Sequence, residues 1–142
     1  MRGLAVAAMS LALAGAVHAE TPHVNYLLQC QGCHLPDGSG TPGSVPALAG
    51  SMARFLSVPG GREFLVRVPG SAQSSLGDED LAALLSWMVH HFGPAADAAD
   101  FVPYTAEEVA RLRHTPLVDV ESVRAGLIAK MTPAESAGRP TD

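Results

Sequence analysis

The sequence predicts an all-α fold, and three patterns predict it. Apolar residues recur at helical spacing in 78–89, behind three acidic residues, and a Gly-Pro pair stops the run. Residues 105–108 have the spacing of a capping box, which marks a helix start. Apolar residues also recur at helical spacing in 120–131. No strand-like run of β-branched residues precedes Cys30, so nothing there favours an alternating βαβ chain.

Length and composition limit the classes of function that this protein can have. A chain of 142 residues forms one ordinary domain, or a small domain with an appendage. The formal net charge is −5 and no basic run occurs, which argues against binding to nucleic acid or to an anionic membrane surface. With one Trp, two Tyr and four Phe, large core side chains are few. We therefore expect another group to fill part of the core.

Residues 1–19 have the features of a secretory signal peptide. A positive start at Arg2 is followed by the almost wholly apolar stretch 4–17, and the small residue Ala19 stands before Glu20. The stretch is shorter than the roughly 20 residues of a membrane-spanning helix, and no later segment is long enough. We expect cleavage after Ala19 and a soluble, periplasmic protein with no membrane span. An uncleaved N-terminal anchor is the alternative.

Cysteine spacing gives the strongest chemical signal in the chain. Residues 30–34 read Cys-Gln-Gly-Cys-His. Two thiols at this spacing can each add across a vinyl group of haem, and the adjacent imidazole can then bind the iron. The motif predicts one covalent haem c, with Cys30 and Cys33 as tethers and His34 as the axial metal ligand.

Two other chemistries can use such a cysteine pair. A thiol–disulfide oxidoreductase would use Cys30 and Cys33, but it wants a strand before the motif and a helix after it. A structural zinc site would need further ligands, and His90, His91 and His114 come with no second cysteine pair.

The flanks of the motif resemble those of class I cytochromes c. Tyr26 stands four residues before Cys30, a Gly-rich turn follows in 34–40, and residues 45–50 look like the Pro-x-Leu segment of that family. The resemblance covers residues 20–95 and implies a cytochrome c-like helical fold around one covalent haem. It also implies that the carbonyl of Pro46 accepts a hydrogen bond from His34. A haem-bound imidazole needs such an acceptor to fix its orientation.

The resemblance further implies how the helices pack. In this family the last helix crosses the first, so Trp87 is expected against Tyr26. The apolar stretch 62–68 forms a short helix or a strand, since its β-branched content suits both.

The chain departs from the family at the second axial ligand. Class I cytochromes usually supply a methionine from the loop before the last helix, but residues 69–77 contain none. Gln73 sits about where that methionine would be. The alternatives are a vacant or water-occupied position, or one of the following ligands: Met52, Met88, Gln73, His90 or His91.

Residues 96–142 extend beyond the resemblance. Asp97–Asp100 indicate a linker, a helix is expected from Thr105 to before Pro116, a second near 120–131, and a frayed, disordered tail from Thr132. The apolar stripe of the second helix either packs on the haem domain or makes 105–131 a docking surface for a partner enzyme. Arg111, Arg113 and His114 form a locally basic spot that we expect to be solvated.

The sequence therefore predicts an electron-transfer protein rather than an enzyme. We expect single electrons to pass from a periplasmic dehydrogenase to a downstream carrier or oxidase. A haem with an open iron position, acting in peroxide chemistry or small-ligand binding, is the alternative.

Overall fold

The computed structural model describes residues 20–94 and 98–131. The predicted signal peptide, part of the linker and the predicted tail lie outside the described residues. The all-α prediction is confirmed, because this part of the chain contains helices and no strand, with one isolated bridge between Thr41 and Val45. In chain order the helices are α1 (Pro22–Gln29), α2 (Gln31–His34), α3 (Met52–Phe55), α4 (Gly61–Arg67), α5 (Pro69–Ala72), α6 (Asp78–Phe92), α7 (Ala106–Arg113) and α8 (Val120–Lys130).

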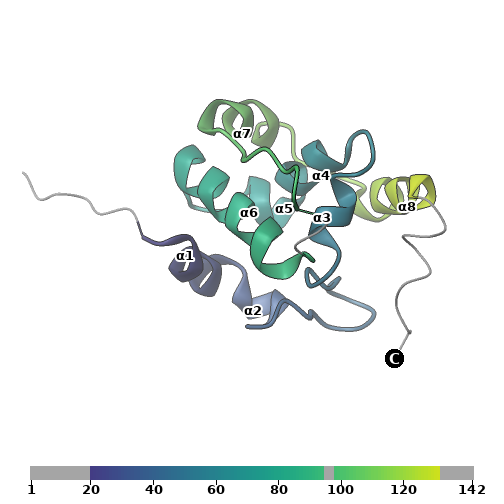
Figure 1. Cartoon of the computed structure of the whole chain (residues 1–142), viewed down its shortest axis with the longest axis horizontal. Coiled ribbons are helices and arrows are strands. Elements are labelled where there is room, and N and C mark those ends of the chain that lie inside the picture. Colours follow the sequence, from purple (N-terminus) through teal and green to yellow (C-terminus); the bar gives the residue numbers. More distant parts are fainter. Residues whose placement is uncertain (1–19, 95–97, 132–142) are drawn as a thin grey trace, which may run out of the picture.

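Helix α6 is the centre of the fold, and α1, α3 and α7 pack around it (Figure 1). Three acidic side chains occupy its first turn, where they complement the helix dipole, and it ends at Phe92 before Gly93. Its apolar face is almost wholly removed from water and supplies much of the core. Among the helices described, none combines the length and the apolarity needed to cross a bilayer.

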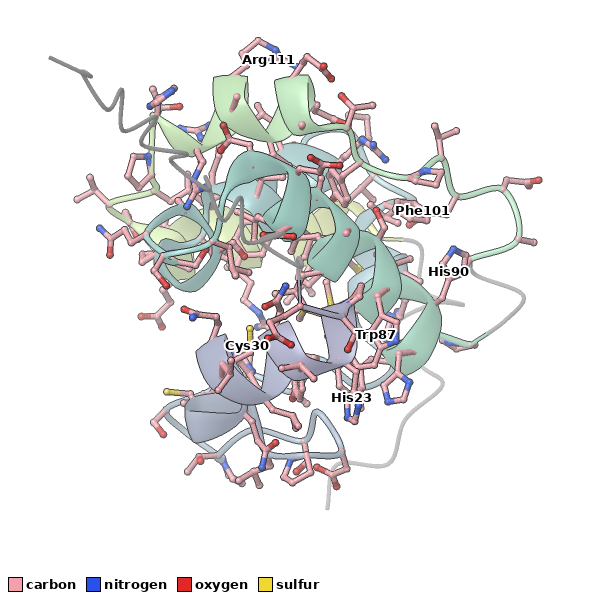
Figure 2. All side chains as sticks on the ribbon, turned by 90° about the vertical axis from the view of Figure 1, so that its left-hand side faces the viewer. His23, Cys30, Trp87, His90, Phe101 and Arg111 are labelled. Atoms are coloured by element: carbon pink, nitrogen blue, oxygen red, sulfur yellow. The ribbon has the colours of Figure 1, made fainter. Side chains whose placement is uncertain are left out.

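Helix α1 crosses α6 through aromatic contacts. Tyr26 is 1% exposed, and its ring centroid lies 5.8 Å from that of Trp87 and 5.0 Å from that of Phe92. Figure 2 shows Trp87 beside His23 at this crossing, and their ring centroids are 5.6 Å apart. The pair expected from the sequence is therefore present, and it fixes the segment that leads into Cys30.

Residues 62–67 of the stretch 62–68 are helical, as part of α4. Gly60 takes the left-handed backbone conformation (φ 91°) just before the helix begins. Val68 is extended (φ −58°, ψ 140°), as the residue before a proline tends to be, and this ends the helix. These flanking residues decide between two structures that the β-branched pattern alone left open.

The two helices of the extension pack on the rest of the chain. Helix α7 lies against α4 and α6 and buries Val109 and Leu112. Helix α8 contacts α4 and buries Leu127, whereas Val123 and Ile128 on the same helix are 37% and 36% exposed. The apolar stripe of α8 is thus covered in part by the body of the protein.

An ion pair joins α4 to the extension. The Arg62 guanidinium donates from Nε to Glu108 Oε1 (2.6 Å) and from Nη2 to Oε2 (2.7 Å). It also donates to the carbonyls of Val102 and Pro103 and lies 4.1 Å from the ring centroid of Tyr104. The Thr105 side chain caps α7 by accepting a hydrogen bond from the Glu108 N–H, as predicted. The Glu108 carboxylate accepts its hydrogen bonds from Arg62. This bidentate pair holds the extension in place.

We expect Glu108→Gln to lower the free energy of unfolding by about 2 kcal/mol at pH 7. Hydrogen bonds from Arg62 hold the pKa of Glu108 below its ordinary value. A depressed carboxyl pKa stabilises the fold above the ordinary pKa, and this contribution is lost as pH falls through the depressed one. Urea unfolding at pH 7 and in acid should therefore show a difference from the parent that disappears at low pH. A difference that persists unchanged in acid would contradict the role of this charge.

Candidate haem site

The cysteine motif forms the single helical turn α2. The N–H groups of Cys33 and His34 both donate to the Cys30 carbonyl, at 3.1 and 3.0 Å. Both thiols are free; Cys30 is half-buried and Cys33 is exposed. All three side chains line one cavity of about 340 Å³. The five-residue motif therefore presents two thiols and one imidazole to the same space.

The His34 imidazole is fixed by a backbone carbonyl. Its Nδ1 lies 3.2 Å from the carbonyl oxygen of Pro46, so the Nδ1–H tautomer donates to Pro46 and leaves Nε2 free. Burial lowers the pKa of His34, and the Pro46 contact opposes this only in part. The neutral ring that results is the form that binds a metal.

The turn between His34 and Pro46 depends on two glycines. Gly38 and Gly40 have positive φ (74° and 63°), and a Cβ at Gly40 would lie 2.4 Å from the Val45 carbonyl oxygen. The Leu48 N–H donates to the Gly38 carbonyl at 2.7 Å and closes the turn. This closure brings Pro46 back against a histidine twelve residues earlier.

Tyr26 supports the motif from α1. Its hydroxyl donates to the backbone carbonyls of His34 and Leu35. Burial, with smaller contributions from Cys30 and Asp37, raises the pKa of Tyr26 to about 12, so it remains a donor at any physiological pH. The aromatic residue quoted for the family resemblance thus anchors the end of α2.

The cavity walls fit a large apolar ring. The cavity volume lies in the range of ligand pockets, and the side chains that line it are mostly aliphatic or aromatic. The apolar part of the lining comprises Met52, Phe55, Phe64, Leu65, Val68, Leu81, Leu84, Leu85 and Met88. Two free thiols and a neutral imidazole in the same lining are the groups that a covalent haem needs.

A charged residue of the extension completes the cavity. Arg124 of α8 lines it, with the guanidinium carbon 5.9 Å from the centroid of the Phe55 ring. Arg54 lies beside Arg124 in a small adjoining hollow and has a buried Nε without a hydrogen-bond partner. No acidic side chain within residues 20–94 and 98–131 pairs with either arginine. Such positive charge fits the two carboxylates that haem carries.

The candidates for the second axial ligand divide into two groups. Met52 and Met88 line the cavity, whereas Gln73, His90 and His91 are exposed and do not line it. Figure 2 shows His90 next to Phe101, well away from Cys30. The ring centroids of His90 and Phe101 are 5.4 Å apart. The His91 ring stacks on Trp87 at 4.3 Å.

Arg111, Arg113 and His114 were expected to form a solvated basic spot, and for Arg113 this expectation is wrong. Its side chain is only 13% exposed. It donates to the carbonyls of Ala72, Ser74 and Leu76, and to the Asp78 carboxylate at 3.0 Å. Arg111 points outward from α7, as Figure 2 shows, and His114 is exposed. The sequence carried no signal for the Arg113 contacts, because its partners lie 35 to 41 residues away.

The geometry supports neither alternative to haem attachment, that is, neither a thiol–disulfide redox centre nor a structural zinc site. Burial, together with the charge of Cys33, raises the pKa of Cys30 to about 11, whereas a reactive redox thiol needs a lowered pKa. The motif follows a helix and not a strand. Within the described part of the chain, no three His, Cys, Asp or Glu side chains gather as a metal site, so the zinc interpretation also lacks ligands.

A helical chain whose cavity presents two free thiols and an oriented, neutral imidazole has the arrangement that a c-type cytochrome needs. Comparison with known proteins agrees. One cytochrome c-552 of Thermus thermophilus is 36% identical, over 72% of this chain and 82% of the relative. A second cytochrome c-552 of Thermus thermophilus is 39% identical, over 60% of this chain and 79% of the relative. No protein-family model matches the chain. The chain belongs to the class I c-type cytochromes, which carry a covalently bound haem c.

Proposed function

We propose that this cytochrome is a periplasmic monohaem electron carrier that accepts single electrons from a periplasmic dehydrogenase and passes them to a downstream carrier or oxidase. Membership of the class I c-type cytochromes supports a role in electron transfer. The observation that carries the rest is the apolar cavity lined by Cys30, Cys33 and His34. Bound haem c supplies a one-electron couple, and no further reactive group is needed for the transfer.

Each residue of the site has a separate task in this proposal. Cys30 and Cys33 hold the haem through thioether bonds, and His34 binds the iron through Nε2. The Pro46 carbonyl keeps the imidazole in one orientation and raises its basicity. Tyr26 holds the backbone at His34 in place. The aliphatic walls exclude water from the ring, and Arg124 balances the haem carboxylates.

The surface around the motif favours an apolar or basic partner. Leu28 and Leu35 flank the motif in the sequence and are 69% and 42% exposed, and Cys33 is also exposed. The chain is acidic, and the haem carboxylates add further negative charge. A partner with a basic rim around an apolar contact face would complement this surface.

Stopped-flow electron exchange tests this proposal. The reduced holoprotein is mixed with two oxidised small cytochromes, one with a basic and one with an acidic surface. We expect rapid one-electron exchange that is faster with the basic partner and slows as salt is added. A reduced haem that passes no electron to either cytochrome but is oxidised by peroxide would overturn the carrier function.

A further inference from the structure

Two partly buried arginines have no hydrogen-bond acceptor in the part of the chain that the structure describes. Arg62, Arg67 and Arg113 each donate to carbonyl or carboxylate oxygens. Arg54 and Arg124 donate to no protein oxygen within that part, and the Nε of Arg54 is buried without a partner. Because buried polar groups in folded proteins are nearly always hydrogen-bonded, this pair needs an acceptor from elsewhere.

Both arginines line one small hollow that adjoins the haem cavity. The hollow has a volume of about 160 Å³, and its lining comes from α3, α8 and the residues beside them: Ser51, Arg54, Phe55, Arg124, Ile128 and Met131. Ser51, Phe55 and Arg124 also line the haem cavity, so the two spaces meet at these residues. A group attached to the edge of a bound haem can therefore enter the hollow from the cavity.

The lining of the hollow selects a negatively charged group on an apolar stem. Arg54 and Arg124 are the charged side chains in this lining. The Ser51 hydroxyl is already engaged, since it donates to the Ala47 carbonyl at 2.6 Å. One carboxylate has enough lone pairs to accept hydrogen bonds from two guanidinium groups, and such charge-assisted bonds are strong. A haem carboxylate, which ends a short hydrocarbon chain, matches both features.

We propose that one haem carboxylate enters this hollow and accepts hydrogen bonds from Arg54 and Arg124 together, which ties α8 to the haem and raises the reduction potential. The inference rests on the proposed carrier function, because it requires a haem held by Cys30, Cys33 and His34. The reduced haem has one positive charge fewer than the oxidised haem, so nearby positive charges favour it. In a partly buried hollow, water screens these charges less than at the surface.

The carboxylate also decides how the two arginines affect α8. Leu127 is the buried side chain of this helix, while Val123 and Ile128 are partly exposed, so apolar packing alone holds it weakly. With a carboxylate between them, Arg124 tethers α8 to the haem. With no anion there, the like charges of Arg54 and Arg124 would repel and loosen the helix. Removal of the Arg124 charge therefore has opposite effects on α8 in the two cases.

The equilibrium constant for reduction of the holoprotein by a reference cytochrome tests the effect on the potential. Arg54→Gln and Arg124→Gln should each lower this constant by about tenfold, whereas Arg124→Lys should keep most of it because the charge remains. Arg111→Gln is the matched control, since Arg111 is exposed and points outward from α7.

Constants that are equal in the parent and all of these variants would overturn the proposal, and continued electron exchange would leave the carrier function intact. Absence of covalent haem would instead overturn the carrier function itself.

Amide hydrogen exchange of residues 120–131 in the holoprotein gives a second readout. Arg124→Gln should speed exchange across α8, because the helix loses its tether to the haem. Arg111→Gln should leave this exchange unchanged. Slower exchange in Arg124→Gln would show relief of repulsion between two arginines with no anion between them. Either slower or unchanged exchange would overturn the proposal.

Two further arms test other sources of the negative charge. Inorganic phosphate added at constant ionic strength supplies a free anion, and Glu135→Gln removes a carboxylate of this chain that lies outside the described residues. Neither should change the equilibrium constant or the exchange of α8. A constant that varies with phosphate concentration, or an exchange rate that Glu135→Gln raises as much as Arg124→Gln does, would overturn the assignment to a haem carboxylate.

Discussion

Replacing His34 with glycine is expected to leave haem attached through Cys30 and Cys33 but to remove the spectral bands of imidazole ligation. His34 carries the only imidazole among the residues that line the described cavity, and its Nδ1 contact to Pro46 leaves Nε2 free to bind a metal. Removing the ring leaves a space of matching shape beside the Pro46 carbonyl. Free imidazole added to the variant should fill this space and restore the bands.

The matched control is His114→Gly, because His114 is exposed and lies on the extension. This variant should keep the parent spectrum with and without added imidazole. The measurement is the visible spectrum of the oxidised and reduced proteins at increasing imidazole concentration. A His34→Gly spectrum identical to that of the parent would show that another residue binds the iron.

Replacing Gly61 with alanine is expected to destabilise the fold by about 3 kcal/mol or more. A Cβ at this position would lie 1.7 Å from the Phe55 carbonyl oxygen, which is backbone and cannot turn aside. Helices α3 and α4 would have to separate. Because Phe55 and Phe64 both line the cavity and stack at 4.9 Å, the haem environment should change as well.

Gly126→Ala is the contrasting variant, because it is expected to stabilise the fold. Gly126 lies within α8, and an added Cβ there would meet no atom within 4 Å. Alanine should raise stability by up to about 1 kcal/mol, since glycine is the poorer helix former. Denaturant unfolding of the two variants should therefore move in opposite directions. A Gly61→Ala protein as stable as the parent would mean that α3 and α4 do not pack as described.

Local signals made the long helices predictable. The apolar spacing, the acidic opening and the Gly-Pro stop of 78–92 all lie within one segment, and the structure confirms them as α6. The capping residue Thr105 likewise marked the start of α7. Segment 62–68 was ambiguous because β-branched residues suit both helix and strand, and the backbone of Gly60 and Val68 decided it.

The chemistry of the site was predictable for a similar reason. Two thiols and an imidazole within five residues define covalent haem attachment without any tertiary information. Pro46 needed the family resemblance, because nothing local links it to a residue twelve positions earlier. The second axial ligand depends on which side of the cavity Met52 and Met88 occupy, and spacing along the chain does not report that.

Sequence patterns could not predict the long-range ion pairs. Arg62 pairs with Glu108 across 46 residues, and Arg113 with Asp78 across 35. Each arginine stands among ordinary helix-forming residues, so nothing distinguishes it from a solvated side chain. Arg124 enters the cavity only because α8 packs back on α4. The extension therefore contributes Arg124 to the candidate haem site, which only the fold reveals.

The mass of the intact polypeptide after secretion by a host that matures c-type cytochromes tests the central claim most directly. Two thioether bonds predict a mass higher by one haem, and colour that stays with the protein through acidic organic extraction. The double variant Cys30→Ser, Cys33→Ser should show the unmodified mass and lose its colour on extraction. A colourless parent protein with unmodified mass would contradict the assignment of Cys30, Cys33 and His34 as a covalent haem site.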